Sequence, residues 1–181
     1  MIIRCTAIFL FLVTFSVLGN SQNRVQWLSW DQAMKKNQVE KRKFVVDVYT
    51  DWCGWCKKMD KATFQDDKIA RYINEHYYAV KLDGESKKQI VFKDKVYKYQ
   101  RGGRRGYHEL PAALMQGKMS YPTVVFLDET ENVIQAIPGF QNADSFELIM
   151  TYFAGNHYKK TPWKSYQRSY QSQLAVPVNA H

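Results

Sequence analysis

A pair of cysteines placed directly after a short apolar run constrains this chain more than any other feature. The run is Phe44–Tyr49, and residues 52–57 then read Trp-Cys-Gly-Trp-Cys-Lys. Strands that are buried on both faces are short and almost continuously apolar, so the motif is expected to join a buried strand to a helix. The first N–H groups of a helix are unpaired and partially positive, which favours the thiolate of Cys53. Because the thiolate is the nucleophile in disulfide exchange, Cys53 is the expected attacking sulfur.

The first 21 residues form a separate segment. Met1–Arg4 is a short basic stretch, Cys5–Leu18 is almost wholly apolar, and Gly19–Ser21 supplies the small residues that a signal peptidase reads. This pattern predicts a secretory signal peptide over 1–21 that is cleaved after Ser21. About 14 apolar residues are fewer than the roughly 20 that span a bilayer, which argues against a membrane anchor. We therefore expect a periplasmic or otherwise exported protein.

The cysteine count follows from that cleavage. The chain has three cysteines, and removal of Cys5 leaves Cys53 and Cys56. A structural disulfide gains more stability from closing a long loop than from bridging a two-residue gap. We therefore interpret the pair as a reactive dithiol that cycles with a Cys53–Cys56 disulfide.

Composition narrows the class of partner. With 181 residues and a hydrophobic fraction of 45 %, one domain with a packed core is expected. The formal charge is +9, or +8 without Arg4, which favours acidic partners or anionic membrane surfaces. The basic residues gather in Lys93–Arg105 and Lys159–Arg168, which we interpret as solvated faces. Export and the lack of a nucleic-acid-binding motif argue against nucleic acid as a partner.

The pattern of apolar and capping residues predicts an alternation of helices and strands. Residues 84–106 are rich in charge, and their pattern predicts a hairpin around 94–95 followed by a glycine-rich turn. Residues 156–181 show no clear period and are expected to form a loosely packed polar and aromatic tail. The expected helices cover about 30–41, 54–61, 66–77, 108–116 and 142–155, and the expected strands cover 44–49, 78–83, 123–127 and 133–137. This order indicates an α/β fold in which helices cover both faces of a central mixed sheet. Cys53 would then lie at the C-terminal edge of a strand, where open α/β sheets place their sites.

Two stretches carry a resemblance to a known family. Phe44–Lys57 resembles the active-site strand, turn and helix of thioredoxin-fold proteins almost position for position. Tyr121-Pro122-Thr123, placed before a hairpin, resembles the cis-proline loop of that family, and Gly139 matches a glycine that is usual near the site. The broken helix at 63–67 is more similar to exported bacterial thioredoxin-like proteins, such as the C-terminal domain of the transmembrane thiol:disulfide interchange protein.

The resemblance covers about 44–83 and 118–154. It implies a three-layer thioredoxin-like fold for a domain over 22–155, in which 84–106 is a hairpin insertion that plain thioredoxin lacks. Contacts with partners made by the insertion, or by the tail over 156–181, therefore cannot be transferred from the family.

The family implies a role for each residue of the dithiol motif. Cys53 would attack a substrate disulfide, and Cys56 would resolve the mixed disulfide. Asp47 lies six residues before Cys53 in an otherwise apolar strand, and it is the candidate for proton transfer with Cys56. Burial raises the pKa of a carboxyl group toward the range that suits this task. The alternative for Asp47 is a carboxylate at the strand edge that faces water.

Four further residues are implied to meet the substrate. Trp52 and Trp55 would form apolar surface beside the sulfurs, and the backbone of Tyr121, before a cis Pro122, would pair with an extended substrate segment. A core aromatic for Trp52 and an ordinary trans proline are the alternatives. Thioredoxin has proline where this chain has Trp55, so the redox potential of the family cannot be transferred.

The leading hypothesis is therefore an exported thiol:disulfide oxidoreductase that needs no cofactor, with reduction or interchange as the favoured direction. Its partners would be protein disulfides and a thiol protein that donates or accepts electrons, and a membrane-bound partner is compatible with export. His76, His108 and His157 lack the spacing of metal ligands, so no metal site is expected. Two alternatives stay open: a redox-inert binding module with a thioredoxin fold, and a protein that handles metal through its two thiolates.

Overall fold

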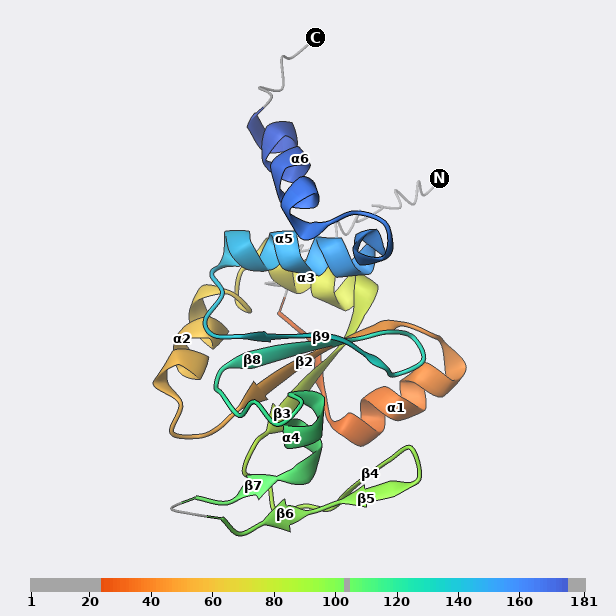
Figure 1. The fold of residues 1–181 in the computed structure, drawn as a ribbon, viewed down its shortest axis with the longest axis vertical. Helices are drawn as coiled ribbons and strands as arrows, with labels where there is room; N and C mark the ends of the chain where they lie inside the picture. The colour runs from red at the N-terminus through yellow and green to blue at the C-terminus, as the bar shows by residue number, and fades with distance from the viewer. Residues whose placement is uncertain (1–23, 103–104, 176–181) are drawn as a thin grey trace, which may run out of the picture.

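The computed structural model describes residues 24–102 and 105–175 of the chain, so the expected signal peptide lies outside the described residues. A five-stranded sheet in the order β1-β3-β2-β8-β9 forms the middle layer (Figure 1). Strands β1, β3 and β2 are parallel, and β8 and β9 complete the sheet in antiparallel pairing. The bounds of these strands are β1 Trp27–Leu28, β2 Lys43–Tyr49, β3 Tyr77–Asp83, β8 Thr123–Leu127 and β9 Val133–Pro138. The predicted mixed sheet is confirmed, although the two-residue β1 was not expected.

Helices cover both faces of this sheet. Helices α1 and α4 pack on one face, and α2, α3 and α5 pack on the other (Figure 1). Side-chain caps fix several of their starts, with Ser29 before α1, Asp66 before α3 and Asn142 before α5. The helices are α1 Trp30–Val39, α2 Gly54–Ala62, α3 Asp67–His76, α4 Glu109–Leu114, α5 Ala143–Ala154 and α6 Trp163–Ala175. In the described part of the chain, none of them is long and apolar enough to cross a bilayer.

The core has one half on each side of the sheet because successive side chains of a strand point to opposite faces. Val45 of β2 and Phe126 of β8 contribute to the half beneath α3 and α5, where Phe126 packs on Phe153 with ring centroids 4.6 Å apart. Phe44 and Val46 contribute to the half beneath α1 and α4. All these side chains are fully buried or nearly so. Strand β2 is thus buried on both faces, as its continuous apolar run predicted.

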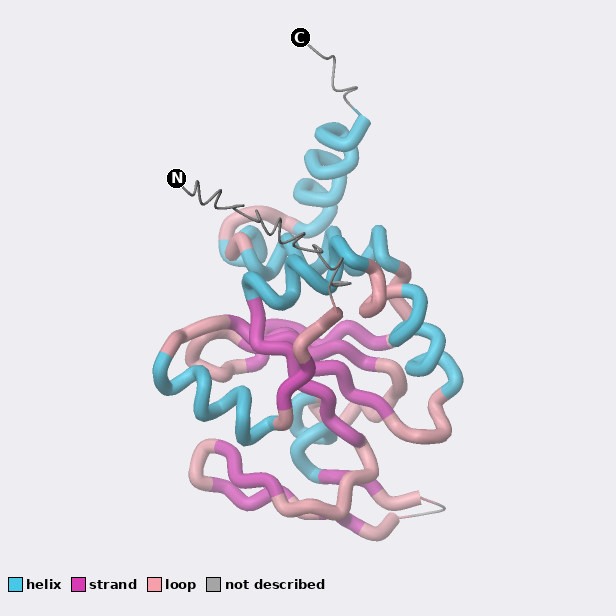
Figure 2. The backbone as a smooth tube through the Cα atoms, turned by 180° about the vertical axis from the view of Figure 1, so that it is seen from behind, coloured by secondary structure: helices cyan, strands magenta, loops and turns pink. Residues whose placement is uncertain are grey.

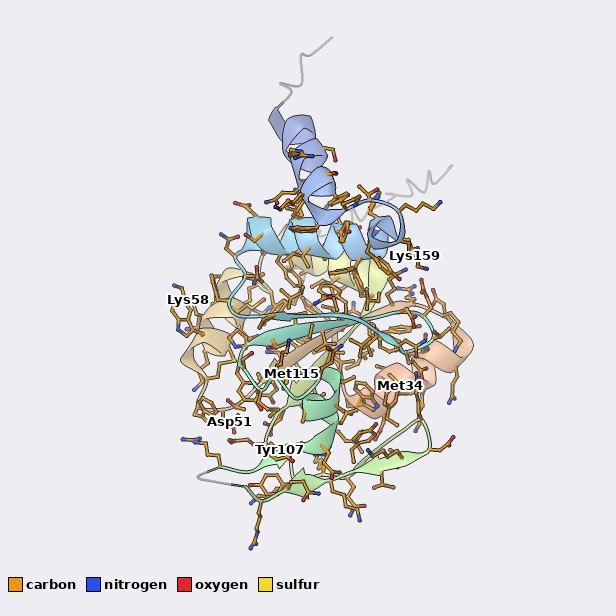
Figure 3. The ribbon with its side chains drawn as sticks, in the orientation of Figure 1. Met34, Asp51, Lys58, Tyr107, Met115 and Lys159 are labelled. Carbon is orange, nitrogen blue, oxygen red and sulfur yellow. A yellow bond between two sulfur atoms is a disulfide. The ribbon has the colours of Figure 1, made fainter. Side chains whose placement is uncertain are left out.

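Between β3 and α4 the chain forms two small hairpins, which lie apart from the main sheet in Figures 1 and 2. The first pairs β4 (Ile90–Phe92) with β5 (Lys95–Tyr97), so the hairpin expected around 94–95 is confirmed. The second pairs β6 (Tyr99–Gln100) with β7 (Tyr107–His108), a pairing that the sequence did not indicate. Figure 3 places Tyr107 beneath Asp51, on the same side of the molecule as the start of α2.

His108 fastens the second hairpin to the body of the protein. Its side chain is fully buried, and the ring Nδ1 accepts a hydrogen bond from the N–H of Leu110 at 3.1 Å, which caps α4. The ring Nε2 lies 2.8 Å from the carbonyl oxygen of Lys88, and the backbone N–H donates to the carbonyl of Gly84. His108 was expected at the start of a helix over 108–116. It is instead the cap of a helix that ends at Leu114.

The prediction of a loosely packed tail over 156–181 is wrong for the part that the structure describes. A short 3-10 turn, His157–Lys159, leads into α6. Tyr166 of α6 is 9 % exposed, lies 5.0 Å from the ring of Tyr152 on α5, and donates a hydrogen bond to Thr151 at 3.1 Å. Three aromatic residues, Trp163, Tyr166 and Tyr170, recur at the spacing of one helical face, and this pattern could have revealed the helix from the sequence.

Replacement of Tyr166 tests whether α6 is part of the folded domain. We expect Tyr166→Ala to lower the free energy of unfolding by about 3 kcal/mol, because it removes a buried ring and its hydrogen bond. Urea denaturation measures the change. Arg168→Ala, at an exposed position of the same helix, should change stability by less than about 0.5 kcal/mol. Equal stability of the two variants would contradict the docking of α6 on α5.

Candidate functional site

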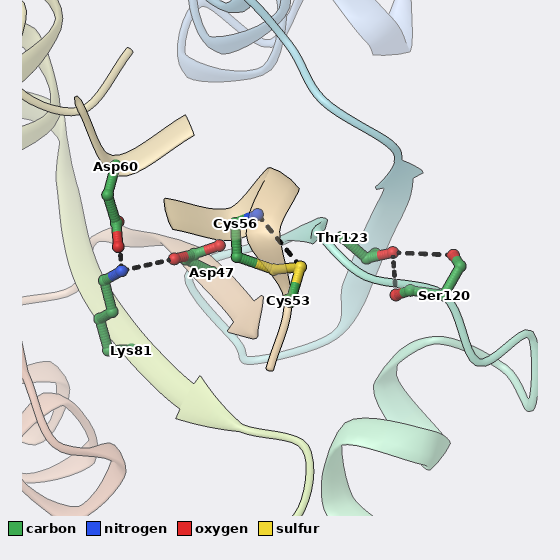
Figure 4. Close-up of a disulfide and its surroundings, with 7 residues drawn as sticks. All are labelled: Asp47, Cys53, Cys56, Asp60, Lys81, Ser120 and Thr123. Carbon is green, nitrogen blue, oxygen red and sulfur yellow. Dashed lines mark hydrogen bonds and ion pairs between the residues drawn. A yellow bond between two sulfur atoms is a disulfide. The ribbon is translucent and has the colours of Figure 1, made fainter. Parts of the chain in front are cut away.

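The site is built around a disulfide at the start of α2. Cys53 is the N-cap residue of this helix, and a disulfide joins it to Cys56, one turn inside, with Cα atoms 5.3 Å apart (Figure 4). The Cys53 sulfur accepts a hydrogen bond from the N–H of Cys56 at 3.1 Å. Each cysteine is 4 % exposed. The first sulfur therefore lies where the unpaired N–H groups of a helix stabilise negative charge.

A buried carboxyl group lies on the inner side of the disulfide. Asp47 of β2 is 2 % exposed, and Figure 4 shows its carboxylate between Cys56 and Lys81. The ammonium nitrogen of Lys81 lies 2.9 Å from Asp47 Oδ2 and also bonds to the carboxylate of Asp60 on α2. The alternative in which Asp47 faces water is therefore excluded by its burial.

The electrostatics of this pair follow from its burial. Removal from water raises the pKa of Asp47 from its usual 3.8 to about 6, although the positive charge of Lys81 opposes the rise. Burial lowers the pKa of Lys81, but the carboxylates of Asp47 and Asp60 outweigh this effect, and the net shift is upward. Lys81 thus keeps its charge, and Asp47 can gain or lose a proton within about one pH unit of neutrality.

Sequence reasoning missed Lys81 and Asp60. Lys81 stands directly opposite Asp47 in the parallel pairing of β2 with β3. The only sign of this contact in the sequence was a lysine within an otherwise apolar strand. Its interpretation needed the register of the two strands, which an isolated sequence does not give.

On the other side of the disulfide lies the loop before β8. The peptide bond between Tyr121 and Pro122 is cis, and Pro122 is buried. Thr123 donates a hydrogen bond from its hydroxyl group to the carbonyl of Ser120 at 2.9 Å, which closes the loop (Figure 4). The N–H of Gly139, a residue with φ of 89°, donates to the carbonyl of Pro122 at 2.8 Å. These bonds hold the loop between β9 and the start of α2.

Tyr121 packs closely over the start of the insertion. A Cβ atom on Gly84 would come within 2.4 Å of the Tyr121 hydroxyl oxygen, so a side chain at this position would force the ring to move. Partial burial, with the nearby carboxylates of Glu85 and Asp83, raises the pKa of the Tyr121 phenol to about 12. The side chain is therefore a neutral phenol at physiological pH.

Trp52 joins the disulfide to the insertion. It is 49 % exposed, so the alternative of a core aromatic is excluded, and its edge meets the ring of Tyr121 at 5.8 Å. The indole N–H donates to Glu85 Oε1 at 3.0 Å, and the guanidinium carbon of Arg105 lies 4.7 Å from the ring. Glu85 and Arg105 both belong to the inserted segment. No sequence signal placed them at the site, because the family resemblance does not extend to them.

Trp55, between the two cysteines, is the most exposed aromatic side chain at the site, at 56 %. Its ring lies 5.6 Å from that of Phe140, and the ammonium nitrogen of Lys58 lies 4.5 Å from its centre. Neither Phe140 nor Lys58 was expected at the site. The two tryptophans thus form an exposed aromatic surface beside Cys53, with one cation on each ring.

Within 24–102 and 105–175, no three His, Cys, Asp or Glu side chains are placed to share a metal ion. The three histidines that the sequence singled out each make a local contact. The ring of His76 lies 4.2 Å from that of Tyr72, His108 caps α4, and His157 lies 4.7 Å from the ring of Tyr166.

Comparison with known proteins connects this geometry to one family. The profile of the thioredoxin-like domain family matches residues 30–154, a range that includes Asp47, both cysteines and Pro122. Human spermatogenesis-associated protein 20 is 33 % identical over 82 residues, which are 45 % of this chain and 10 % of that protein. The thiol:disulfide interchange protein DsbD of Haemophilus influenzae is 26 % identical over 105 residues, which are 56 % of this chain and 15 % of that protein. The chain thus spans only a small part of these relatives.

Two solved structures have a similar fold. A thioredoxin-fold protein from Helicobacter pylori superposes with a TM-score of 0.56 at 18 % identity, covering 75 % of this chain and 87 % of that one. A thioredoxin from Thermus thermophilus gives 0.53 at 14 % identity, with 71 % and 86 % covered. Together with the family match, these likenesses confirm the three-layer fold that the sequence predicted.

The raised pKa of Asp47 predicts how stability depends on pH. Between about pH 4 and pH 6, the folded protein keeps a proton on Asp47 that the unfolded chain has released, so the free energy of unfolding falls as the pH rises. A shift of about two units corresponds to a total fall of about 3 kcal/mol. We expect Asp47→Asn to remove this fall in the oxidised protein, as measured by urea denaturation at a series of pH values.

Asp51→Asn is the matched control, since Asp51 is exposed in the turn that follows the same strand. It should retain the pH dependence of the parent protein. An Asp47→Asn variant that loses as much stability as the parent over this window would show that the pKa of Asp47 is not raised.

Proposed function

The chain belongs to the thioredoxin-like family, and from this membership we propose that it is an exported thiol:disulfide oxidoreductase that reduces or exchanges disulfides in protein substrates. The fold and the Cys-Gly-Trp-Cys disulfide are those of a thiol:disulfide oxidoreductase. The observation that carries the proposal is the disulfide at the start of α2, with the ionisable Asp47 buried behind it. Export is supported by the signal-peptide pattern of residues 1–21.

The reaction begins from the reduced protein. The Cys53 thiolate attacks one sulfur of the substrate disulfide, and a mixed disulfide forms while the other substrate sulfur leaves as a thiolate and takes up a proton. The Cys56 thiolate then attacks Cys53, which releases the second substrate thiol. Two electrons pass from the protein to the substrate, and the Cys53–Cys56 disulfide is the product. A dithiol protein must supply two electrons to start the next cycle.

Asp47 serves the second step, in which Cys56 must lose its proton. Cys56 is buried inside the first turn of α2, away from bulk water, and the Asp47 carboxylate is directed toward it (Figure 4). A pKa of about 6 leaves most of this carboxyl group ionised at pH 7, so it can accept the proton. The charge of Lys81 keeps the pKa from rising further.

The substrate would meet the loop before β8 and the two tryptophans. We propose that the backbone of Tyr121 pairs with an extended segment of the substrate, while the side chains of Trp52 and Trp55 cover the residues beside its cysteine. Pro122 is held in this loop by the hydrogen bond from Gly139. Reduction or interchange is the proposed direction, and it is supported by the similarity to DsbD, whose name describes thiol:disulfide interchange.

Cysteine variants test the order of attack. Cys53→Ser should reduce the rate of insulin reduction by dithiothreitol to the uncatalysed background, because it removes the nucleophile. Cys56→Ser should accumulate the mixed disulfide, visible as a covalent adduct on a non-reducing gel, whereas Cys53→Ser should form none. Insulin reduction that is unchanged by Cys53→Ser would refute the proposal, and a parent protein no faster than the uncatalysed background would favour a redox-inert binding module.

Asp47 variants test proton transfer in the resolving step. Asp47→Asn should slow the decay of the mixed disulfide by about 100-fold at pH 7, within the range for loss of a general base. Stopped-flow tryptophan fluorescence can follow this decay, because Trp52 and Trp55 lie beside the disulfide. The formation of the mixed disulfide at Cys53 should change much less.

Lys81→Met separates this chemical role from a structural one. Removal of the cation should raise the pKa of Asp47 above 6 and move the pH profile of the resolving step to higher pH. A uniform loss of rate at every pH, with an unmoved profile, would show that the pair only supports the structure.

A further inference from the structure

The inserted segment between β3 and α4 carries a strong positive charge. Over 84–108, the described residues include seven lysines and arginines but only two acids, Glu85 and Asp94. In the described part of the chain, none of these seven cations lies within ion-pair distance of a carboxylate. All seven are exposed, and they are Lys87, Lys88, Lys93, Lys95, Lys98, Arg101 and Arg105. The positive charge of this segment is therefore accessible to an acidic partner.

Contacts place one part of this charge beside the disulfide. Arg105 lies over Trp52, and the neighbouring Gly106 is pressed against the ring of Tyr99. The ammonium nitrogen of Lys87 in turn lies 6.0 Å from the centre of the Tyr99 ring. Arg105 on Trp52 is thus linked through its neighbour Gly106 and the ring of Tyr99 to Lys87. We call the cations Arg105 and Lys87 the basic strip.

Two carboxylates at the junction of β3 and the insertion already accept hydrogen bonds within the protein. Glu85 accepts the indole hydrogen bond of Trp52, and Asp83 accepts a hydrogen bond from the backbone N–H of Glu85 at 2.9 Å. On the opposite side of the disulfide, Lys58 lies over Trp55 and likewise has no carboxylate partner in the described residues. Unpaired cations therefore flank the aromatic surface on both sides.

We infer that the protein substrates are acidic next to their disulfide, and that the acidic segment lies along the basic strip while one substrate sulfur meets Cys53. The inference rests on the proposed function and names the class of substrate for the same site. Complementary charge raises the rate of encounter and fixes the orientation of the partner. The position of Arg105 on Trp52 makes the strip continuous with the surface proposed to hold the substrate beside its cysteine.

The experiment compares disulfide-linked peptides that differ only in the residues flanking the cysteine, which are aspartate, serine or lysine. Rates of reduction by the reduced protein are measured by stopped flow, and each is divided by the rate with the uncharged hydroxyethyl disulfide. We expect the aspartate peptide to react about tenfold faster than the serine peptide, and the lysine peptide to react slowest. The preference should shrink as salt is raised, since the Debye length is about 8 Å at 0.15 M and about 3 Å at 1 M.

A charge-reversal pair shows which cations act. Arg105→Glu with Lys87→Glu should abolish or invert the preference for aspartate. Lys93→Glu with Lys95→Glu is the matched control, because these lysines belong to the same insertion but lie at the turn of the first hairpin. The control makes the same change in net charge and should keep at least half of the preference.

Three outcomes would overturn the inference. Equal rates for the three peptides, with normal reduction of hydroxyethyl disulfide, would leave the oxidoreductase proposal intact and refute the acidic substrate. Equal loss of preference in both charge-reversal pairs would assign the effect to net charge rather than to the strip. Salt-sensitive binding to vesicles of phosphatidylcholine and phosphatidylglycerol, lost in the Arg105 and Lys87 pair while the peptides react alike, would identify the strip as a membrane contact. Failure to react with any disulfide would instead refute the proposed function.

Discussion

The pairing of β2 with β3 on one side and with β8 on the other is the constraint on which the site depends. Parallel register with β3 sets Asp47 opposite Lys81, and antiparallel register with β8 sets the same residue opposite Val124, just after the cis-proline loop. The strand then ends at Tyr49, so Cys53, the N-cap residue of α2, lies at the edge of the sheet. One central strand thus aligns the sulfurs, the carboxyl group behind them and the loop beside them. A slip of one residue would turn Asp47 to the opposite face.

Features that are local in the sequence were the ones that could be predicted. The apolar run before Cys53 indicated a doubly buried strand, and capping residues such as Asp66 and Asn142 located helix starts to within one or two residues. The burial of Asp47 also followed from its position in that run. Each of these features is set by neighbours within a few positions, which is why a single sequence sufficed.

Features that depend on distant parts of the chain could not be predicted in this way. Lys81 meets Asp47 only through strand register, and Arg105 meets Trp52 across more than fifty positions of sequence. The prediction of a loosely packed tail was wrong for another reason. Trp163, Tyr166 and Tyr170 have the spacing of one helical face, but the polar residues between them obscured this pattern. In that segment the burial of Tyr166 on α5, rather than helix propensity, stabilises the helix.

The two sides of the disulfide are formed by different parts of the chain, so the residues proposed for proton transfer are separate from those proposed for substrate recognition. On the inner side, Lys81 joins the buried Asp47 to the more exposed Asp60 in a charge network, and the sheet topology places Asp47 for the proton transfer proposed at Cys56. On the outer side, Trp52 is bound to residues of the insertion, a segment that the sheet does not require. Under the proposals made for the two sides, chemistry and recognition are free to vary separately. We expect a change in the insertion to alter which disulfides reach Cys53 while the proton transfer proposed at Cys56 stays the same.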